Sequence, residues 1–507
     1  MEGTIKVFKL NESFLKIDCE NRIGKQLFDH FSYFKPGYQF STAFKNDLWD
    51  GKEKLFNQYD WTLPVGLFED LKMFAKVMDY EIKVMPTPAG HPIDHVKVSF
   101  EEVMEFTNSL NLPFTPYDFQ FKYFYTAITK KRGGLISPTG SGKSLIAYMI
   151  ARWYAEKVSG GKIMIVVPDT GLVEQLYKNF VEFSKGDDRF NPEGEIHTIY
   201  SGKPKHFAQN IVITTWQSVY KQPAKWFQQF GCIIGDELHH FKADSLRKIM
   251  NKSWGVSYRI GMTGSLDDST VHELVIKGLF GRMYQFVTTK ELQDRGILAK
   301  LDIDIPVLQY EQKVKKKTGI KGKGSARYAM EVKWLEEYEP RNDFIVEETL
   351  ESTGVTLVLF THIKHGKHLK SLLESRINTG RKVYLVYGNV KTTERERIRE
   401  IARESDDAII VASYGTFSTG IDIPAIQKIV LASFSKSQVR VLQSIGRGLR
   451  KYKDLVTKLV DICDDIRTGK TKNFSLRHAE ARIKIYKQQE FDYSLRTVEI
   501  YDEARLL

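Results

Sequence analysis

The sequence has few cysteines, no long apolar run and no targeting pattern at its start. Three cysteines, Cys19, Cys232 and Cys463, lie far apart among 507 residues and lack the C-x-x-C spacing of a zinc ribbon. This excludes a disulfide framework and fits a reducing compartment. The opening residues MEGTIKVFKL lack the order of a signal peptide, and no apolar run has the length of a membrane span. We therefore expect a cytoplasmic protein with no membrane partner.

Acidic residues are fewer than basic ones. The chain has 63 Asp and Glu against 75 Lys and Arg, which gives a net charge of +12 and a pI near 9.1. A basic excess favours an anionic polymer as partner, although many soluble enzymes also carry one. The chain is too long for a single hydrophobic core, so about three compact units are expected. A hydrophobic content of 42% is sufficient to build them.

Two series of short β-branched runs alternate with segments of helical period, which predicts two tandem α/β lobes with parallel sheets. The expected strands of the first lobe are 133–137, 162–168, 211–215, 232–236 and 259–265. Those of the second are 355–362, 382–388, 408–415, 428–433 and 456–463. Ligands of such sheets bind beyond the carboxyl ends of the strands, and polar residues follow the apolar runs in both lobes.

The expected domain boundaries follow from these series. Residues 106–295 are expected to form the first lobe and residues 341–465 the second lobe. Residues 1–105, with strand-like runs at 4–10, 14–19 and 80–86, are expected to form a small α+β accessory domain. Its aromatic residues are compatible with core packing and with DNA binding, so both interpretations stay open.

Two further segments are basic. Residues 296–340 are expected to be a linker or insertion, because 311–328 is rich in Lys and Gly with few apolar residues. This stretch is either a solvated connector or a strap that contacts phosphates. Residues 466–507 are expected to be a C-terminal basic helical extension, helical at 477–489, that packs back on the lobes.

A glycine-containing loop joins an apolar run to a helical segment in LISPTGSGKSLIA, residues 135–147. Gly140 and Gly142 allow backbone amides to turn towards phosphates, Lys143 supplies a point charge, and Ser144 can ligate Mg²⁺. Ser137 stands where the GxxxxGK[ST] pattern has its first glycine. The loop predicts an ATP phosphate site made of Thr139, Gly140, Ser141, Gly142, Lys143 and Ser144.

The stretch CIIGDELHHF ends an expected strand with Asp236 and Glu237. Carboxylates and imidazoles both bind divalent cations, so this stretch alone is compatible with a metal cluster. Beside a phosphate loop it predicts the other half of a nucleotide site, in which Asp236 holds Mg²⁺ with Ser144 and Glu237 is the general base. A zinc site is disfavoured because no further His or Cys ligand has suitable spacing. His240 is expected to be a surface or packing residue.

Five motifs occur in the order SPTGSGKS, GDELHHF, MTGS, YGTFSTGID and QSIGRGLR. Together they resemble the motif set of superfamily-two helicases of the DExH type over about residues 115–450. With a small N-terminal domain that contains LWDG, the chain is similar to the phage helicases of recombination and fork remodelling. The resemblance implies two RecA-like lobes, ATP and Mg²⁺ as cofactors, and a nucleic-acid substrate.

The resemblance also implies residue roles in the first lobe. FTPYDFQFK resembles the adenine-recognising motif, with Gln120 as the base reader and Phe119 or Tyr117 as a stacking ring. Phe119 stands where relatives often have Tyr. His239, Thr263 and Ser265 would couple the nucleotide site to the second lobe and the nucleic-acid track. Gln175, Thr215 and Gln217 are the candidates for contact with the nucleic-acid backbone.

The second lobe carries two further motifs. In YGTFSTGID, the candidates for joining nucleotide to nucleic acid are Thr416, Thr419, Gly420 and Asp422. VLQSIGRGLRKY fits Q-x-x-G-R-x-x-R without a gap, so Arg447 and Arg450 are the arginine-finger candidates and Gln443 should contact the same site. Arginines on the other lobe can stabilise the charge of the transferring phosphoryl group only when the lobes close.

The resemblance implies an ATP-dependent DNA helicase or translocase that unwinds or branch-migrates forked and four-way-junction DNA in phage replication, recombination or repair. An RNA or RNA–DNA hybrid helicase is one alternative. The other is a nucleic-acid clamp that ATP controls without unwinding. We expect a monomer in the host-cell cytoplasm, with duplex, forked or four-way-junction DNA as partner. Phage recombination proteins and single-strand-binding proteins are further candidate partners.

Overall fold

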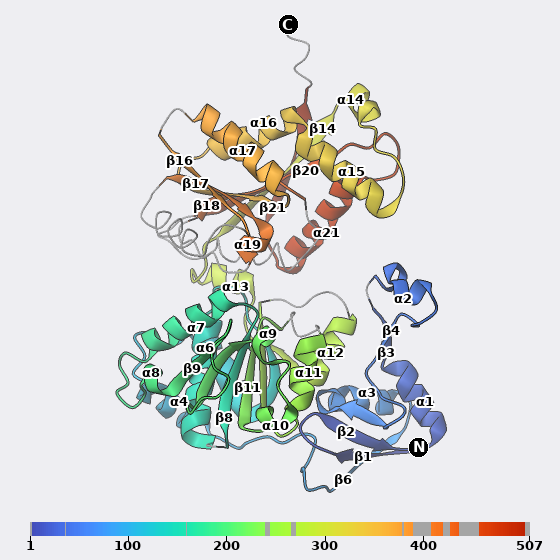
Figure 1. Cartoon of the computed structure of the whole chain (residues 1–507), viewed down its shortest axis with the longest axis vertical. Coiled ribbons are helices and arrows are strands. Elements are labelled where there is room, and N and C mark those ends of the chain that lie inside the picture. Colours follow the sequence, from blue (N-terminus) through green and yellow to red (C-terminus); the bar gives the residue numbers. More distant parts are fainter. Residues whose placement is uncertain are drawn as a thin grey trace. The chain divides into compact units, whose positions relative to one another are not determined.

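The computed structural model of the chain describes residues 3–35, 37–158, 160–238, 244–264, 270–377, 380–388, 407–418, 426–434 and 456–501. It contains two compact units (Figure 1). The first unit holds residues 1–138 and 142–287, and the second holds residues 139–141 and 288–507. Each unit contains a parallel sheet, so the predicted α/β fold with two RecA-like lobes and a small N-terminal domain is confirmed.

The N-terminal domain contains a four-stranded mixed sheet in the order β5-β2-β1-β6. The strands are β1 (Thr4–Lys9), β2 (Phe14–Asp18), β5 (Thr62–Pro64) and β6 (Glu81–Met85). In β1 the side chains alternate between buried and accessible, as expected for a sheet with one covered face. Helices α1 (Asn21–His30) and α3 (Phe68–Val77) supply residues to the same core. The expected strands in this domain are confirmed.

An arm, residues 32–54, leaves this domain. Its base is the antiparallel pair β3 (Ser32–Phe34) and β4 (Lys52–Lys54). Between them lie the short helices η1 (Tyr38–Phe40) and α2 (Thr42–Lys45). Within the first unit, the arm stands away from the four-stranded sheet (Figure 1).

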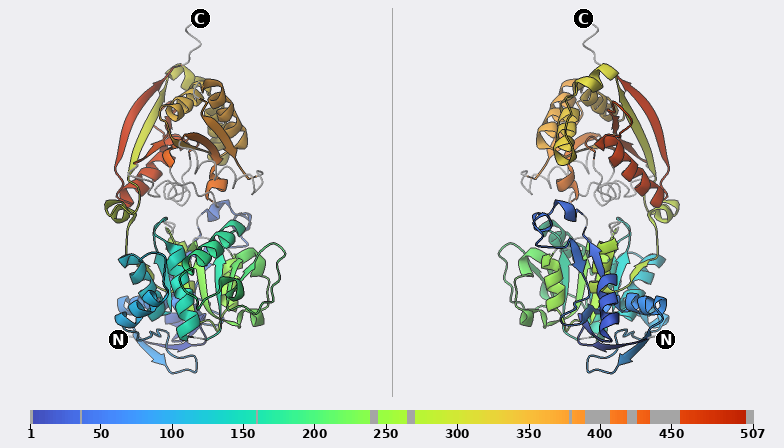
Figure 2. Two further views of the ribbon diagram at one scale, coloured as in Figure 1. Left: turned by 90° about the vertical axis from the view of Figure 1, so that its left-hand side faces the viewer. Right: turned by 90° about the vertical axis from the view of Figure 1, so that its right-hand side faces the viewer.

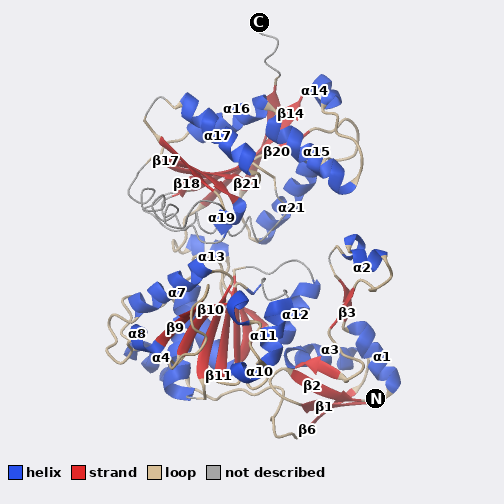
Figure 3. Ribbon diagram, in the orientation of Figure 1, coloured by secondary structure: helices blue, strands red, loops and turns tan. Residues whose placement is uncertain are grey.

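The first lobe contains a seven-stranded sheet in the order β13-β7-β12-β11-β8-β10-β9, and every neighbouring pair is parallel. Its strands are β7 (Arg132–Ile136), β8 (Lys162–Val167), β9 (Ile196–Ile199), β10 (Ile211–Thr215), β11 (Phe230–Asp236), β12 (Tyr258–Thr263) and β13 (Met283–Gln285). Helices lie on both sides of it (Figure 3). The five expected strands are confirmed, and β9 and β13 were not expected.

The N-terminal domain is joined to the first lobe by buried polar contacts. Arg259 of β12 donates to the Ser13 hydroxyl at 2.8 Å, and both residues are buried. A Cβ atom on Gly66 would come within 1.8 Å of the Lys277 carbonyl oxygen, so only glycine allows the two backbones to approach so closely. Leu274 of the lobe is part of the core of the N-terminal domain. The two domains therefore form one compact unit.

The second unit contains an eight-stranded sheet in the order β16-β17-β15-β18-β19-β14-β20, with β21 also paired to β14 (Figure 2). All its neighbouring pairs are parallel. The strands are β14 (Leu301–Tyr310), β15 (Val355–Phe360), β16 (Lys382–Val386), β17 (Ala408–Ser413), β18 (Ile426–Leu431), β19 (Thr457–Asp461), β20 (Cys463–Asp465) and β21 (Tyr493–Ile500). The five expected strands are confirmed, whereas β14, β20 and β21 were not expected.

Most of the Lys- and Gly-rich stretch 311–328 is helical. It contributes to α14 (Gln312–Lys317) and α15 (Gly324–Glu337), so the segment expected to be a linker or insertion is largely folded into helices. The helix expected at 477–489 is present as α21 (Phe474–Gln488), and Arg482 of α21 pairs with Asp461 of β19 in the interior. Helices α16 (Glu339–Leu350) and α17 (Ile363–Arg376) complete this unit around the sheet.

Candidate nucleotide and nucleic-acid site

The predicted phosphate loop lies between the carboxyl end of β7 and helix α6 (Lys143–Trp153). Gly140 and Gly142 have φ angles of 86° and 87°, a region that glycine enters without strain. A Cβ on Gly142 would also lie 2.2 Å from the Gln120 side-chain nitrogen, so the Gln120 side chain would have to move to accept any other residue there. Lys143 and Ser144 follow as the first residues of α6, where free backbone amides favour an anion.

Two contacts hold the start of this loop. The Ser137 amide donates to the Thr263 carbonyl at 2.9 Å, which continues the pairing of β7 with β12. The Lys143 ammonium donates to the Ser137 carbonyl at 3.3 Å. Thr263, one of the three coupling candidates, is therefore attached to the phosphate loop through its backbone. The other two, His239 and Ser265, lie outside the described residues.

The acid pair ends β11, two strands from β7 in the same parallel sheet. The Asp236 Oδ1 atom is buried and has no hydrogen-bond partner among the described residues. Burial and the adjacent Glu237 charge raise the pKa of Asp236 to about 7, although the Lys143 charge acts in the opposite direction. A buried carboxylate oxygen without a partner fits a cation, and Mg²⁺ needs only one or two protein ligands beside phosphates and water. Asp236 and Ser144 therefore fit Mg²⁺.

Glu237 and Leu238 fix the chain beyond Asp236. Glu237 has a φ of 56°, a left-handed conformation that costs a side-chain-bearing residue about 1–2 kcal/mol. Such strain is typical of functional positions. Leu238 is fully buried, and a Cβ on Gly261 of β12 would lie 2.2 Å from it. The small residue on β12 therefore allows the chain after the acid pair to pack against the sheet. His240 lies outside the described residues.

The adenine candidates lie at the start of α5 (Asp118–Lys130). The Gln120 carbonyl oxygen accepts the Tyr117 amide at 2.9 Å, and this leaves the side-chain nitrogen against Gly142. The Phe119 ring is 1% exposed and stacks on Tyr117 with 5.5 Å between centroids, whereas Tyr117 is 45% exposed. Phe119 is thus too buried to stack on a base in this conformation. Of the two rings that the sequence left open, Tyr117 is the accessible one.

The backbone candidates of the first lobe are near the carboxyl ends of β8 and β10. Thr215 ends β10 and is buried, with its hydroxyl 2.9 Å from that of Ser218. Gln217 is exposed and donates to the Pro168 carbonyl at 3.1 Å. Gln175 is half-buried on α7 (Thr170–Phe183). Only Gln217 of these three presents an exposed polar side chain at this edge.

One candidate of the second lobe is described. Thr416 lies on α19 (Tyr414–Ser418), directly after β17, and its hydroxyl is 2.8 Å from that of Ser413. It is 5% exposed. The remaining candidates lie outside the described residues: Thr419, Gly420, Asp422, Gln443, Arg447 and Arg450.

The arm carries features that sequence reasoning did not assign. Phe40 and Leu48 are each 80% exposed, which is unusual for side chains of this size. At its base, Glu53 is 7% exposed and accepts from Lys35 at 2.7 Å and from Arg247. Arg247 lies on α11 (Asp244–Lys252), the helix that follows the acid pair. The aromatic run of the arm is visible in the sequence, but its exposure and this distant ion pair are not.

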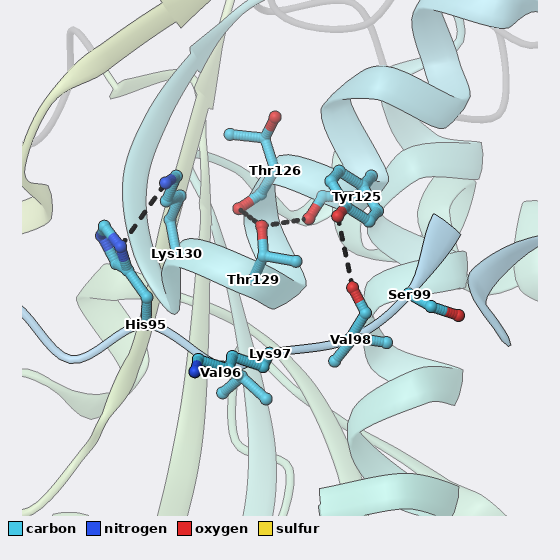
Figure 4. A pocket seen from close by; sticks show the side chains of 9 residues that line it. All are labelled: His95, Val96, Lys97, Val98, Ser99, Tyr125, Thr126, Thr129 and Lys130. Atoms are coloured by element: carbon cyan, nitrogen blue, oxygen red, sulfur yellow. Dashed lines mark hydrogen bonds between the residues drawn. The ribbon is translucent and has the colours of Figure 1, made fainter. Parts of the chain in front are cut away.

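A cavity of about 510 Å³ lies elsewhere in the first unit (Figure 4). It is between the segment before α4 (Phe100–Ser109) and the far end of α5, where His95 approaches Lys130 at 3.5 Å and Tyr125 donates to the Val98 carbonyl. Gln120 is ten residues from Lys130 on α5, which corresponds to about 15 Å along the helix. The cavity is therefore separate from the phosphate loop.

The arrangement of loop, acid pair and two parallel sheets defines a class, the RecA-like ATPases of helicase superfamily two. Three family models agree with this: "DNA helicase UvsW, N-terminal" matches residues 4–85, "Type III restriction enzyme, res subunit" matches residues 100–268, and "Helicase conserved C-terminal domain" matches residues 341–452. The predicted membership of the superfamily is confirmed.

The comparisons narrow the class to one family. The chain is 32% identical to the ATP-dependent DNA helicase UvsW of Enterobacteria phage T4 over 98% of this chain and 100% of the relative. The crystal structure of T4 UvsW matches with a TM-score of 0.52 at 31% identity, over 98% of this chain and 100% of that one. The chain belongs to the UvsW family and is an ATP-dependent DNA helicase.

More distant relatives share the fold. The DNA 3'-5' translocase XPB2 of Sulfurisphaera tokodaii is 24% identical over 68% of this chain and 80% of its own length. The restriction–modification enzyme LlaBIII matches with a TM-score of 0.56 at 16% identity, over 85% of this chain and 34% of that one. Within the described residues, no helix combines the length and hydropathy needed to cross a membrane.

Proposed function

We propose that this helicase acts on branched DNA, at forks and four-way junctions, and that it unwinds or branch-migrates them. The observation that carries the proposal is the arm, which has exposed Phe40 and Leu48 and belongs to the same compact unit as Lys143 and Ser144. Apolar side chains that stand away from a fold can stack on unpaired bases or wedge between base pairs. Unpaired or distorted bases are concentrated where DNA branches.

The roles proposed for the site are those of a two-lobed motor. Lys143 and the α6 amides hold the ATP phosphates, Glu237 orients the attacking water, and Tyr117 and Gln120 hold the base. Ser144 and Asp236 would hold Mg²⁺, which neutralises phosphate charge when bound. The proposed residues of the second lobe are Thr416, Thr419, Gly420, Asp422, Gln443, Arg447 and Arg450. Closure of the lobes on ATP would change the grip on the DNA backbone.

The first test is ATP hydrolysis without nucleic acid and with linear duplex, a fork, a four-way junction and RNA. We expect branched DNA to stimulate most, because both the motor and the arm then have a ligand. Lys143→Ala should remove hydrolysis in every sample and serves as the control for contaminating activity. Greatest stimulation by RNA would contradict the proposal. Stimulation by DNA without displacement of any strand would favour the clamp.

The second test concerns the arm. We expect Phe40→Ser with Leu48→Ser to lower fork unwinding about tenfold, since a lost base stack costs about 1–3 kcal/mol. ATP hydrolysis stimulated by linear single-stranded DNA should change less than twofold. The matched control is Tyr59→Ser, because Tyr59 is 87% exposed in the same domain but lies outside the arm. Equal fork unwinding by the two variants would exclude the arm from the reaction.

A further inference from the structure

The second unit carries a strongly basic stretch that the motor motifs do not use. From residue 312 to residue 333 the sequence has eight Lys and Arg residues and one acid, Glu331. From residue 466 to residue 479 it has four Lys and Arg residues and no acid. The whole chain has 75 basic and 63 acidic residues, so these two stretches are far more basic than the rest.

Contacts bring the two stretches together on one face. Glu331 of α15 accepts the Phe474 and Ser475 amides at 3.0 and 2.8 Å, so it caps the first turn of α21. The Tyr328 and Phe474 rings meet at 5.2 Å. The one acid in the first stretch is therefore fully buried and used for capping, and it does not offset the surface charge. Figure 1 shows α14 and α15 on one side of the second unit.

Several of these cations are not neutralised by neighbours. Ion pairs involve Lys313 with Glu311, Arg467 with Asp465 and Lys472 with Glu480. Six lysines among the others are exposed and have no ion pair with any residue that the structure describes, and we call them the basic surface: Lys316, Lys317, Lys321, Lys323, Lys333 and Lys470. A group of unpaired like charges favours the binding of an anion, because the anion offsets their mutual repulsion.

The loop between α14 and α15 is open to a ligand. Gly319, Gly322 and Gly324 have φ angles of 66°, 88° and 62°, and a Cβ on any of them would meet nothing within 4 Å. Packing within the unit therefore does not require glycine here, although the backbone conformation does. Side chains are absent at these points, and Lys321 and Lys323 lie between them. Such a loop allows phosphate groups to approach the backbone closely.

The chemistry of this surface suits a duplex better than a single strand. Lysine contacts phosphate as a point charge and carries no sequence information. The aromatic rings nearby, Tyr328, Trp334 and Phe474, pack against the core of the unit instead of presenting a stacking platform. Nine residues of α15 separate Gly324 from Lys333, about 14 Å along the helix. This spans about four phosphates of one strand at 3.4 Å spacing.

We propose that the basic surface binds the phosphate backbone of duplex DNA, as a contact additional to the motor motifs. This rests on the proposed function in one respect, that the duplex held here is one of the duplexes of a branched DNA substrate. A branched substrate has more than one duplex. A second contact would hold one duplex in place while the motor moves along another. The contact should be independent of sequence and sensitive to salt.

The test is the salt dependence of binding to linear duplex and to a fork, with the full chain and with Lys316→Gln, Lys317→Gln, Lys321→Gln and Lys323→Gln combined. Each lost phosphate contact lowers the slope of log K against log salt by about 0.9, so a fall of about three to four is expected. Affinity for duplex at low salt should fall about 10- to 100-fold. ATP hydrolysis saturated with a short single strand should be unchanged.

The matched control removes four lysines of the same unit that lie outside the basic surface: Lys370, Lys382, Lys484 and Lys487, each changed to Gln. Its slope should fall by less than one. Equal slopes for the two variants would overturn the proposal. If the unaltered chain is not stimulated by forks, the proposed function fails. If forks stimulate it and the basic-surface variant keeps the full slope, only this inference fails.

Discussion

Asp236→Asn is expected to lower DNA-stimulated ATP hydrolysis by about three orders of magnitude. Its Oδ1 atom is buried without a partner among the described residues, at the end of the strand that faces the phosphate loop. Asparagine has the same shape but no charge, so it removes the electrostatic contribution and leaves the packing unchanged. Removal of one preorganised electrostatic contact in an active site costs about 10²–10³ in rate, and loss of a metal ligand adds to this.

The same substitution is expected to make the nucleotide-free protein more stable. Burial raises the pKa of Asp236 to about 7, so at pH 8 the folded chain holds an ionised carboxylate in an unfavourable place. The pKa of this carboxyl is higher in the folded chain than in the unfolded chain. Its ionisation therefore lowers the free energy of unfolding increasingly as the pH rises towards 7. The neutral amide lacks this penalty. The variant should therefore unfold at a higher temperature than the unaltered chain at pH 8, with a smaller difference at pH 5.

Steady-state hydrolysis and thermal unfolding of the same preparations check both parts. Asp294→Asn is the control, because Asp294 is exposed on α13 (Thr289–Asp294) and pairs with Lys290 on the surface. Activity within tenfold of the unaltered chain would remove Asp236 from the proposed site. Lower stability of the variant at pH 8 would mean that a neighbouring group stabilises the Asp236 carboxylate of the unaltered chain in the absence of nucleotide.

The strands of both lobes could be predicted because a parallel sheet covered on both faces requires continuous apolar runs. β8 and β15 have this form. β14 was missed because it includes Asp302, Asp304 and Pro306, and because its Lys-rich neighbour suggested a linker. The structure explains the Asp304 charge, because Arg496 of β21 forms an ion pair with Asp304 at 2.7 Å. A strand that carries charges for a distant partner does not show the apolar pattern.

The sequence can name candidates where one short stretch carries the proposed chemistry, as in the phosphate loop and the acid pair. The contact of Gln120 with Gly142 depends on how α5 packs, and the buried state of Phe119 depends on Tyr117 beside it. The pairing of Glu53 with Arg247 joins residues 194 positions apart. No local sequence pattern encodes this ion pair, because Glu53 and Arg247 each look like an ordinary charged residue of its own element.

Arg341→Ala is expected to lower the free energy of unfolding of the second unit by about 3–5 kcal/mol. Arg341 of α16 is 1% exposed and donates to Asp464 at 2.7 and 3.2 Å. Tyr310 and Ser475 also donate to Asp464, at 2.7 and 3.1 Å. Removal of the guanidinium would leave a fully buried carboxylate without its counter-charge, which costs more than the pair contributes.

Urea unfolding of the full chain, followed by a signal from the second unit, measures this effect. The matched control is Arg376→Ala, since Arg376 pairs with Asp343 where both side chains are partly exposed and such pairs contribute about 0–1 kcal/mol. Arg341→Met with Asp464→Leu should recover part of the loss, because no unpaired charge remains. Equal destabilisation by Arg341→Ala and Arg376→Ala would show that the buried Asp464 carboxylate does not need the charge of Arg341.

This cluster also explains why the second lobe extends beyond its sequence motifs. Tyr310 lies on β14, Arg341 on α16, Asp464 on β20 and Ser475 on α21. Sequence patterns assign these elements to a linker, a lobe and a C-terminal extension, yet one buried carboxylate binds a residue from each. A buried charge must be satisfied by all its partners at once, so the four elements are expected to fold cooperatively. The basic surface lies on α14, on α15, in the loop between them and in the segment before α21 of the same unit, so it should move with the lobe as one body.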